Sequence, residues 1–239
     1  MPYFLYLILG FFPALLWLAF FLHKDRHPES RKQVAKVFLW GAVATIPALA
    51  IELSIAKALE LTNWPKLVVV LISVFIGVAL IEEITKYLVV RWRALPNKEF
   101  DEPFDTIVYM VTAAMGFAAA ENILIFVGTS QLQLSFFDLL LTSLVSRFLG
   151  GTLLHALASA TVGFFVALSI MHDFTHRKWL GWGLTIATLL HGAYNLAIIE
   201  LTEMGLKLAF IAVVLVALAA IVSFGLRKVK AMQLICEPD

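Results

Sequence analysis

The stretch LVVVLISVFIGVALIEEITKYLVV, residues 67–90, is long and apolar enough to cross a membrane as a helix, yet it contains two glutamates and a lysine. A transmembrane helix needs about 20 apolar residues at a rise of about 1.5 Å per residue. An ionisable side chain in such a helix costs at least about 2.5 kcal/mol on insertion scales, and it usually faces the bundle interior or a water-filled cavity. The stretch therefore predicts a membrane fold with a polar site that includes Glu82, Glu83 and Lys86.

Similar apolar runs recur along the whole chain. Of its 239 residues, 61% are apolar and only 15% are charged, and the mean hydropathy is +0.90. Soluble proteins, in contrast, are roughly half apolar and about a quarter charged. We therefore predict an all-α, polytopic transmembrane helix bundle that forms one integral-membrane domain over residues 1–239. About seven spans are expected, at residues 3–22, 37–56, 67–90, 106–128, 149–171, 179–199 and 205–226.

The stretch QLQLSFFDLLLTSLVSRF, residues 131–148, is amphipathic and precedes two consecutive glycines. It is typical of an interfacial or partly re-entrant helix that leads into the fifth span, and an eighth span is the alternative.

The expected depths of Glu82 and His155 in the bilayer favour a longer fifth span. The boundaries above put Glu82 roughly 12 Å from the cytoplasmic end of its span and His155 roughly 9 Å from the outer end of its own. In a bilayer core about 30 Å thick, residues at these two depths would not meet. A fifth span that begins near residue 138 would move His155 toward mid-bilayer.

The distribution of basic residues predicts the orientation of the bundle. By the positive-inside rule, the side with most lysines and arginines faces the cytoplasm. This places the N-terminus outside and the C-terminus in the cytoplasm. The residues on the basic side are Lys24, Arg26, Arg31, Lys32, Lys36, Arg91, Arg93, Lys98, Arg177, Lys178, Arg227, Lys228 and Lys230, against Lys57, Lys66 and Lys207 on the other side.

The expected location is the cell membrane, where the chain is a multi-pass protein surrounded by the lipid bilayer. The predicted loops are short, so the function must lie mainly in or at the edge of the membrane, and we expect no nucleic-acid partner. Cys236 is the only cysteine, which excludes a disulfide framework and a cysteine metal site. The sequence leaves the oligomeric state open.

Four predicted spans each carry a polar stripe. Residues four apart on a helix lie one turn above each other on the same face, and each stripe has this spacing. Glu52 and Arg147 lie nearer to span ends, where they are interpreted as residues that snorkel to the interface. The four stripes together predict one shared site, with the pairs Glu82 and Lys86, Phe117 and Glu121, His155 and Ser159, and His191 and Asn195.

The two adjacent glutamates are the strongest sign of chemistry. A structural ion pair between Glu82 and Lys86 would lower the cost of burying two charges. Adjacent residues point about 100° apart on a helix, so Glu83 is not expected to stack on Lys86 in the same way. A second carboxylate in the membrane then needs another purpose, and accepting a proton as a general base is one that suits it.

Two histidines on other spans extend this hypothesis and leave two mechanisms open. In the favoured one, a carboxylate alone activates water and no cofactor is required. In the other, His155, His191 and one of Glu82 or Glu83 hold a zinc ion between helices. The chain has neither a Gly-x-Ser-x-Gly elbow nor a His-Glu-x-x-His motif.

A transporter and a scaffold are the alternatives to a membrane hydrolase. A proton-coupled transporter would also use glutamate, histidine and lysine inside the membrane, although no inverted repeat is visible. A scaffold that binds the transmembrane helix of a partner would not need so many ionisable groups. A membrane hydrolase is therefore favoured.

Four motifs in this order resemble the PrsW family of bacterial membrane proteases. More distantly, they are similar to the CAAX-processing and bacteriocin-immunity group of glutamic intramembrane proteases. The motif-bearing core covers residues 67–199. The motifs are Glu82-Glu83 with Lys86, the segment DEPFDTIVYMVTAAMGFAAAEN at 101–122, HALASATVG at 155–163, and HGAYN at 191–195.

The resemblance implies an intramembrane endopeptidase that makes the first cut in a membrane-anchored protein such as an anti-sigma factor. One of the paired glutamates, with a slight preference for Glu82, is expected to be the general base. His191 and Asn195 would stabilise the oxyanion, and His155 would orient the water or protonate the leaving amine. Lys86 would hold the second carboxylate in place. The candidate catalytic set is Glu82, Glu83, Lys86, Glu121, His155, His191 and Asn195.

Overall fold

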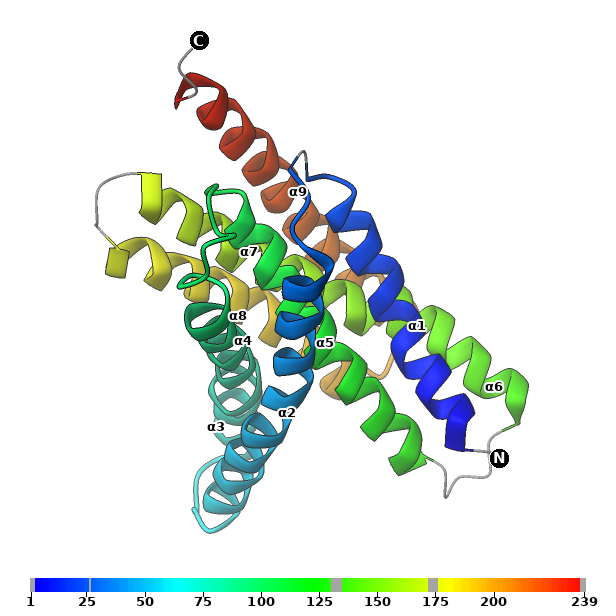
Figure 1. Cartoon of the computed structure of the whole chain (residues 1–239). Coiled ribbons are helices and arrows are strands. Elements are labelled where there is room, and N and C mark those ends of the chain that lie inside the picture. The colour runs from blue at the N-terminus through cyan, green and yellow to red at the C-terminus, as the bar shows by residue number, and fades with distance from the viewer. Residues whose placement is uncertain (1–2, 26, 130–134, 172–175, 237–239) are drawn as a thin grey trace.

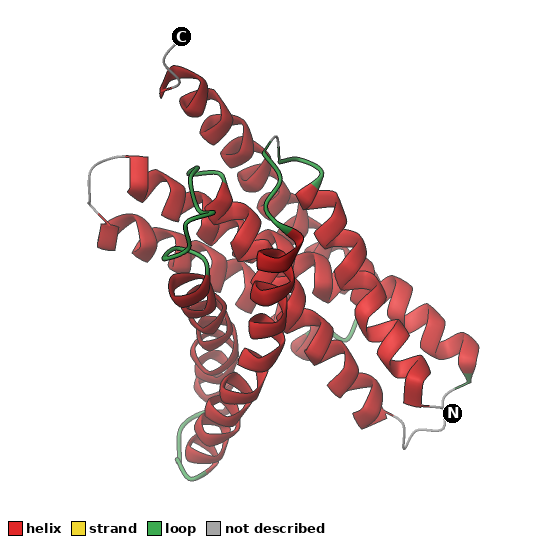
Figure 2. Cartoon of the chain, viewed as in Figure 1, coloured by secondary structure: helices red, strands yellow, loops and turns green. Residues whose placement is uncertain are grey.

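Figure 1 presents the computed structural model of the chain, which describes residues 3–25, 27–129, 135–171 and 176–236. Every regular element in these ranges is a helix (Figure 2). The elements are α1 (Tyr3–Leu22), α2 (Arg31–Glu60), α3 (Lys66–Leu71), η1 (Ile72–Leu80), α4 (Ile81–Arg93), α5 (Asp105–Thr129), α6 (Phe136–Leu141), η3 (Thr142–Gly151), α7 (Thr152–Met171), α8 (His176–Glu200) and α9 (Met204–Cys236).

The described residues contain seven helices long and apolar enough to cross a membrane, which confirms the predicted fold class. The third of them is a continuous rod made of α3, η1 and α4. The fifth is made of α6, η3 and α7. The segments η1 and η3 are π-helical, with hydrogen bonds from residue i to i+5. Each π-helical segment ends shortly before polar residues of the predicted site, Glu82 in one rod and His155 in the other.

The fifth helix begins earlier than its apolar run suggests. It is unbroken over residues 136–171, so residues 136–148 are neither a separate helix nor an eighth span. Residues 131–134 lie outside the described residues. Gly150 and Gly151 do not end the helix. Each instead leaves room for a side chain to pack against the backbone, that of Tyr194 at Gly150 and that of Arg147 at Gly151. The longer fifth helix agrees with the depth argument made from the sequence.

The second helix also begins before its apolar run, at Arg31 instead of residue 37. The hydroxyl oxygen of Ser30 accepts a hydrogen bond from the backbone N–H of Gln33 at 3.2 Å. This contact satisfies one of the free N–H groups at the start of the helix. A capping residue, and not hydrophobicity, therefore sets this boundary.

Helices α5 and α7 form the interior of the bundle. α5 contacts α1, α2, α4 and α7, and α7 also packs against α8 and α9. The loops after α1 and α4 lie at the same end as the C-terminal part of α9, opposite the N-terminus (Figure 1). This arrangement agrees with the distribution of basic residues along the chain. The side of the membrane that each end faces stays a prediction.

Helices α2 and α5 touch backbone to backbone at two glycines. A Cβ atom on Gly116 would lie 1.9 Å from the carbonyl oxygen of Phe38, and a Cβ atom on Gly41 would lie 2.1 Å from that of Ala113. Small residues commonly allow membrane helices to approach each other in this way. The contact brings the polar side chains of α5 close to those of α2.

We expect Gly116→Ala to lower the free energy of unfolding by about 1–3 kcal/mol, because backbone atoms of α2 cannot move aside for the added methyl group. The measurement is the midpoint of thermal unfolding of the purified protein in detergent. Gly128→Ala is the matched control on the same helix, since a Cβ atom there meets nothing within 4 Å. Equal midpoints for the two variants would contradict the close contact.

Candidate functional site

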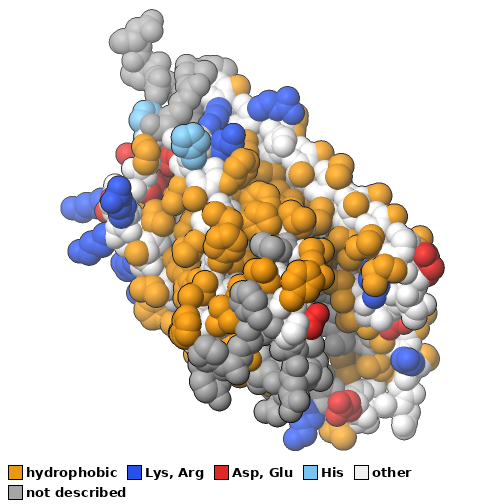
Figure 3. Space-filling model, turned by 90° about the vertical axis from the view of Figure 1, so that its right-hand side faces the viewer, with side chains coloured by type: hydrophobic (Ala, Val, Ile, Leu, Met, Phe, Trp, Pro, Cys, Tyr) orange, Lys and Arg blue, Asp and Glu red, His pale blue; other side chains and the backbone are white. Residues whose placement is uncertain are grey.

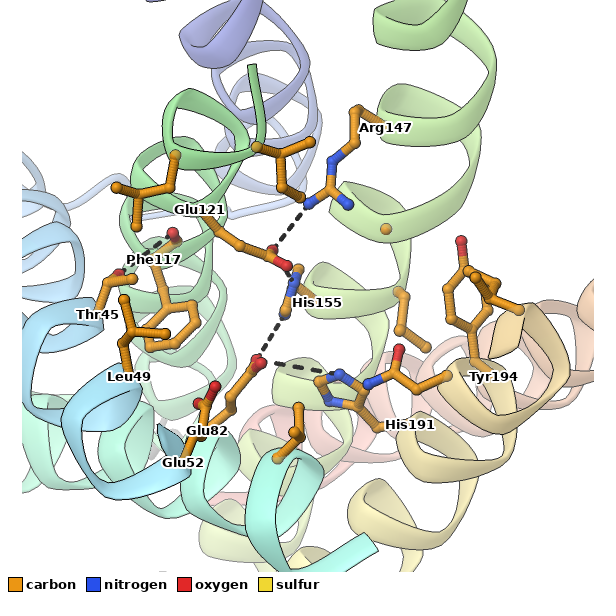
Figure 4. Close-up of a pocket in the computed structure, with 17 residues that line it drawn as sticks. Thr45, Leu49, Glu52, Glu82, Phe117, Glu121, Arg147, His155, His191 and Tyr194 are labelled. Atoms are coloured by element: carbon orange, nitrogen blue, oxygen red, sulfur yellow. Dashed lines mark hydrogen bonds and ion pairs between the residues drawn. The ribbon is translucent and has the colours of Figure 1, made fainter. Parts of the chain in front are cut away.

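The polar stripes of four helices converge on one site inside the bundle. Glu82, Glu83 and Lys86 lie on the first turns of α4, and the other candidates lie on α5, α7 and α8. In Figure 4, Glu82, His155 and His191 point toward one another. The ring centroids of the two histidines are 5.2 Å apart, with the rings nearly perpendicular.

Lys86 is the centre of this site. Its Nζ lies 3.0 Å from Oε2 of Glu82 and 2.9 Å from Oε1 of Glu83, and it donates to Nδ1 of His155 at 2.8 Å. The expectation that only one glutamate contacts Lys86 is therefore wrong. Positions three and four residues apart flank the same side of a helix, and a lysine side chain is long enough to reach both carboxylates. The ring of Phe117, one turn before Glu121, is buried, and its centroid lies 4.6 Å from the same ammonium group.

Glu83 is fully buried, and both of its carboxylate oxygens have partners. Oε1 accepts hydrogen bonds from Lys86 at 2.9 Å and from Nδ1 of His191 at 3.0 Å, while Oε2 accepts one from the hydroxyl of Ser159 at 2.8 Å. A carboxylate with this many donors is held rigidly. Ser159, the residue paired with His155 in its polar stripe, therefore contacts the charged site directly.

Glu82 is the glutamate that faces open space. Its side chain is 6% exposed and lines a polar cavity of about 370 Å³, whereas Glu83 does not line it. Oε2 of Glu82 lies 3.5 Å from Nδ1 of His155 and 3.9 Å from Nε2 of His191. A molecule that enters the cavity can thus reach the Glu82 carboxylate beside both imidazole rings.

His155 is fixed from its other side by an ion pair between two helices. Its Nε2 lies 2.8 Å from Oε2 of Glu121, and the same oxygen is 2.8 Å from Nη2 of Arg147 (Figure 4). Arg147 also donates to the side-chain oxygen of Asn122. The expectation that Arg147 snorkels to the interface is wrong, because its guanidinium is occupied by these two partners. Its position eight residues before His155, about two helical turns, is the signal that could have identified it.

The hydrogen bonds assign a tautomer to each histidine. With Nε2–H donating to Glu121, the Nδ1 lone pair of His155 faces Lys86 and Glu82. With Nδ1–H donating to Glu83, the Nε2 lone pair of His191 faces Glu82. In these tautomers each ring directs an acceptor toward the centre of the site and donates outward to a carboxylate.

The wall of the polar cavity contains further polar residues. Glu52, on α2, lines the cavity, which the interpretation as an interfacial residue did not anticipate. Its carboxylate has neither hydrogen bond nor ion pair within the described part of the chain. The Asn195 side chain lines the cavity too and is likewise without a hydrogen bond there. Tyr194 also contributes to the wall, although no pattern in the sequence predicts this. Both Glu52 and Asn195 are thus available to a bound molecule.

Three side chains of the site have the composition of a zinc site. One donor atom from each of Glu82, His155 and His191 lies within 4.8 Å of the others. Two imidazoles and one carboxylate are ligands that zinc accepts. Each ring also donates its other N–H to a carboxylate, as metal-bound histidines commonly do. One contact opposes this fit, because the ammonium of Lys86 already lies 2.8 Å from the Nδ1 atom that would bind the metal.

Comparisons with known proteins agree on one family. Residues 29–222 match a family model described as "PrsW family intramembrane metalloprotease". The chain is 29% identical over 223 residues to protease PrsW of Bacillus subtilis, with 92% of each chain covered. It is 28% identical over 186 residues to protease PrsW of Oceanobacillus iheyensis, covering 78% of this chain and 79% of the relative. No solved structure matches.

Proposed function

The chain belongs to the PrsW family of intramembrane proteases, and from this premise we propose that it cleaves a membrane-anchored protein by means of a water molecule activated at Glu82. The observation that carries the proposal is that Glu82, and not Glu83, borders the polar cavity beside both histidines. A transporter or a scaffold does not fit membership of a protease family.

The proposed reaction starts with a water molecule hydrogen-bonded to the carboxylate of Glu82. Glu82 accepts a proton from the water as its oxygen attacks the carbonyl carbon of the scissile peptide bond. The Nε2 atom of His191 accepts the second hydrogen of this water in a hydrogen bond and so aims the nucleophile. When the tetrahedral intermediate collapses, the carbon–nitrogen bond breaks and Glu82 returns the proton to the leaving amine.

The negative charge on the intermediate needs hydrogen-bond donors aimed at the developing oxyanion. The amide of Asn195 suits this role, since it borders the cavity and has no hydrogen bond in the described structure. His191 donates its Nδ1–H to Glu83, so it can assist Asn195 only when it is protonated. His191 and Asn195, both expected to stabilise the oxyanion, thus have separate roles in this proposal.

The other charged residues are positioning residues. Lys86 pairs with the carboxylate of Glu82 next to the cavity and so fixes its position, and Glu83 fixes both Lys86 and His191. Glu121, held by Arg147, fixes the ring of His155. Such preorganisation matters because misplacing a reacting group by about 1 Å can reduce a rate about a hundredfold.

The family description also implies a metal. Glu82, His155 and His191 are the residues that would hold it, and a bound zinc ion would lower the pKa of its water and polarise the substrate carbonyl. For this set of ligands to form, the Lys86 ammonium must first leave His155. We therefore favour the metal-free reaction, in which Lys86 keeps its central position.

Removal of metal separates the two mechanisms. We expect the rate of cleavage by the purified protein to be unchanged after treatment with a strong chelator, because the Lys86 ammonium occupies the position next to His155. The measurements are the rate of reporter cleavage and the zinc content per chain. A rate that falls on chelation and returns with zinc would instead assign Glu82, His155 and His191 as metal ligands.

The function itself is tested by co-expression with a single-pass membrane reporter tagged at both ends. An anti-sigma factor with one transmembrane helix is the reporter we propose. The wild-type protein should generate two defined fragments, and Glu82→Gln and His191→Ala should leave the reporter intact at equal membrane abundance. Identical fragments with all three proteins would refute the proposal.

A further inference from the structure

A second hollow lies on the outer surface of the bundle, between α1 and α9. It has a volume of about 600 Å³ and is lined by residues of α1, α7 and α9. α9 packs on α7 and α8, while α1 packs on α5 and α7, so α7 forms the floor of this α1–α9 groove. The apolar part of its wall includes Trp17, Phe20, Leu153, Leu157 and Leu215.

Basic residues close the groove at one end. Lys24, Arg227 and Lys230 belong to its lining, and no acidic side chain does. Lys230 donates to the backbone carbonyl of Lys24 and lies 4.8 Å from the ring of Phe104, which ties α9 to the end of α1. The side chains of Lys24 and Arg227 are exposed. Figure 3 shows the face that carries α1, where a broad hydrophobic surface has lysine and arginine side chains along its upper edge.

The length of the groove matches one leaflet of a bilayer. Leu215 and Arg227 are twelve residues apart on α9, which corresponds to about 18 Å along a helix. The hydrocarbon part of one leaflet is about 15 Å thick, half of the full core. The apolar wall is therefore about as long as one leaflet is deep, and a lipid whose acyl chains lie along this wall would place its headgroup next to the basic residues.

A neighbouring groove of similar size carries a different set of charges. The hollow between α1 and α2 is also apolar, with a volume of about 530 Å³. Its charged residues are Glu29 and Arg31, one of each sign. An apolar groove on the lipid-facing surface is ordinary in a membrane protein, but only the α1–α9 groove of this pair ends in cations alone.

We propose that the α1–α9 groove binds one anionic phospholipid. Its acyl chains lie against Trp17, Leu157 and Leu215, and its phosphate group is bound by Lys24 and Arg227. Basic pockets between transmembrane helices are a known means of binding anionic headgroups. In the predicted orientation this lipid belongs to the cytoplasmic leaflet. The proposal is independent of proteolysis, because none of these residues borders the polar cavity.

Trp17 provides a direct test. The full-length chain is placed in phosphatidylcholine vesicles that contain phosphatidylglycerol, with bromine atoms on the acyl chains of either lipid. The fluorescence of Trp17 is obtained as the difference between the wild type and Trp17→Phe, since the chain has six tryptophans. At equal mole fraction, brominated phosphatidylglycerol should quench Trp17 more strongly than brominated phosphatidylcholine.

Adjacent basic residues on α9 supply a matched pair of variants. Arg227→Gln should reduce the relative affinity for phosphatidylglycerol about fivefold. Lys228→Gln removes the same charge from a residue that is exposed but does not line the groove, and it should leave the quenching unchanged. Lys24→Gln is a second groove variant with the same expected loss. Equal quenching by both lipids, or equal losses with Arg227→Gln and Lys228→Gln, would overturn the proposal in favour of general surface charge.

Discussion

Glu82→Gln should reduce the rate of reporter cleavage by about a thousandfold, whereas the folded protein should remain as abundant and nearly as stable as the wild type. A general base typically contributes a factor of about 10²–10⁴ to a rate, and glutamine cannot accept the proton of the attacking water. The substitution keeps the shape of the side chain next to the polar cavity. Initial rates measured with purified protein in vesicles, together with thermal unfolding, provide the test.

The substitution Glu83→Gln tests which of the two glutamates is the general base. Because both oxygens of Glu83 have partners inside the protein, its main effect should be on stability and on the orientation of His191. Glu200→Gln, at the exposed end of α8, is the matched control and should affect neither property. A stable, inactive Glu83→Gln protein beside an active Glu82→Gln protein would assign the base to Glu83 instead.

Lys86→Met should lower the free energy of unfolding by about 3–5 kcal/mol, because it leaves two buried carboxylates without their shared cation. Removing one partner of a buried ion pair has effects of this size. Lys86 is fully buried and contacts Glu82, Glu83 and His155. The measurement is the thermal unfolding midpoint in detergent, with the exposed Lys57→Met on α2 as a control.

A double substitution tests the physical reason for this loss. If the destabilisation arises from unpaired negative charge, then Lys86→Met combined with Glu83→Gln should be more stable than Lys86→Met alone. Residues in direct contact are expected to show this kind of non-additivity. A double variant that is as unstable as the sum of the two single variants would mean that the loss arises from packing and not from charge.

Patterns along the chain were sufficient for the fold class and for most candidate residues of the site. Apolar runs long enough to cross a bilayer leave few alternatives to a helix bundle, since backbone groups in lipid must pair internally. Ionisable residues inside these runs are expensive, so Glu82, Glu83, Lys86, Glu121, His155 and His191 stood out without a structure. Their convergence followed from the spacing of each polar stripe on its own helix.

The partners of these residues could not be predicted in the same way. Arg147 and Glu52 were interpreted as interfacial because they lie near span ends. Only the tertiary structure brings them to the cavity, because Arg147 pairs with Glu121 of α5 and α2 packs next to α4. The start of the fifth helix at Phe136 was obscured because Gly150 and Gly151 resemble a break. In the folded chain they make room for Tyr194 and Arg147.

The sequence by itself determined that this protein is a membrane helix bundle with a charged centre, because hydrophobic length and helical spacing are local properties. Only the tertiary structure decided which glutamate of the pair faces the cavity. The rotation of a helix about its axis is set by packing against neighbours, and the π-helical segment η1, whose hydrogen bonds span one more residue than those of an α-helix, shifts that rotation directly before α4. As a result Glu82 borders the polar cavity, while Glu83 is enclosed by Lys86, Ser159 and His191.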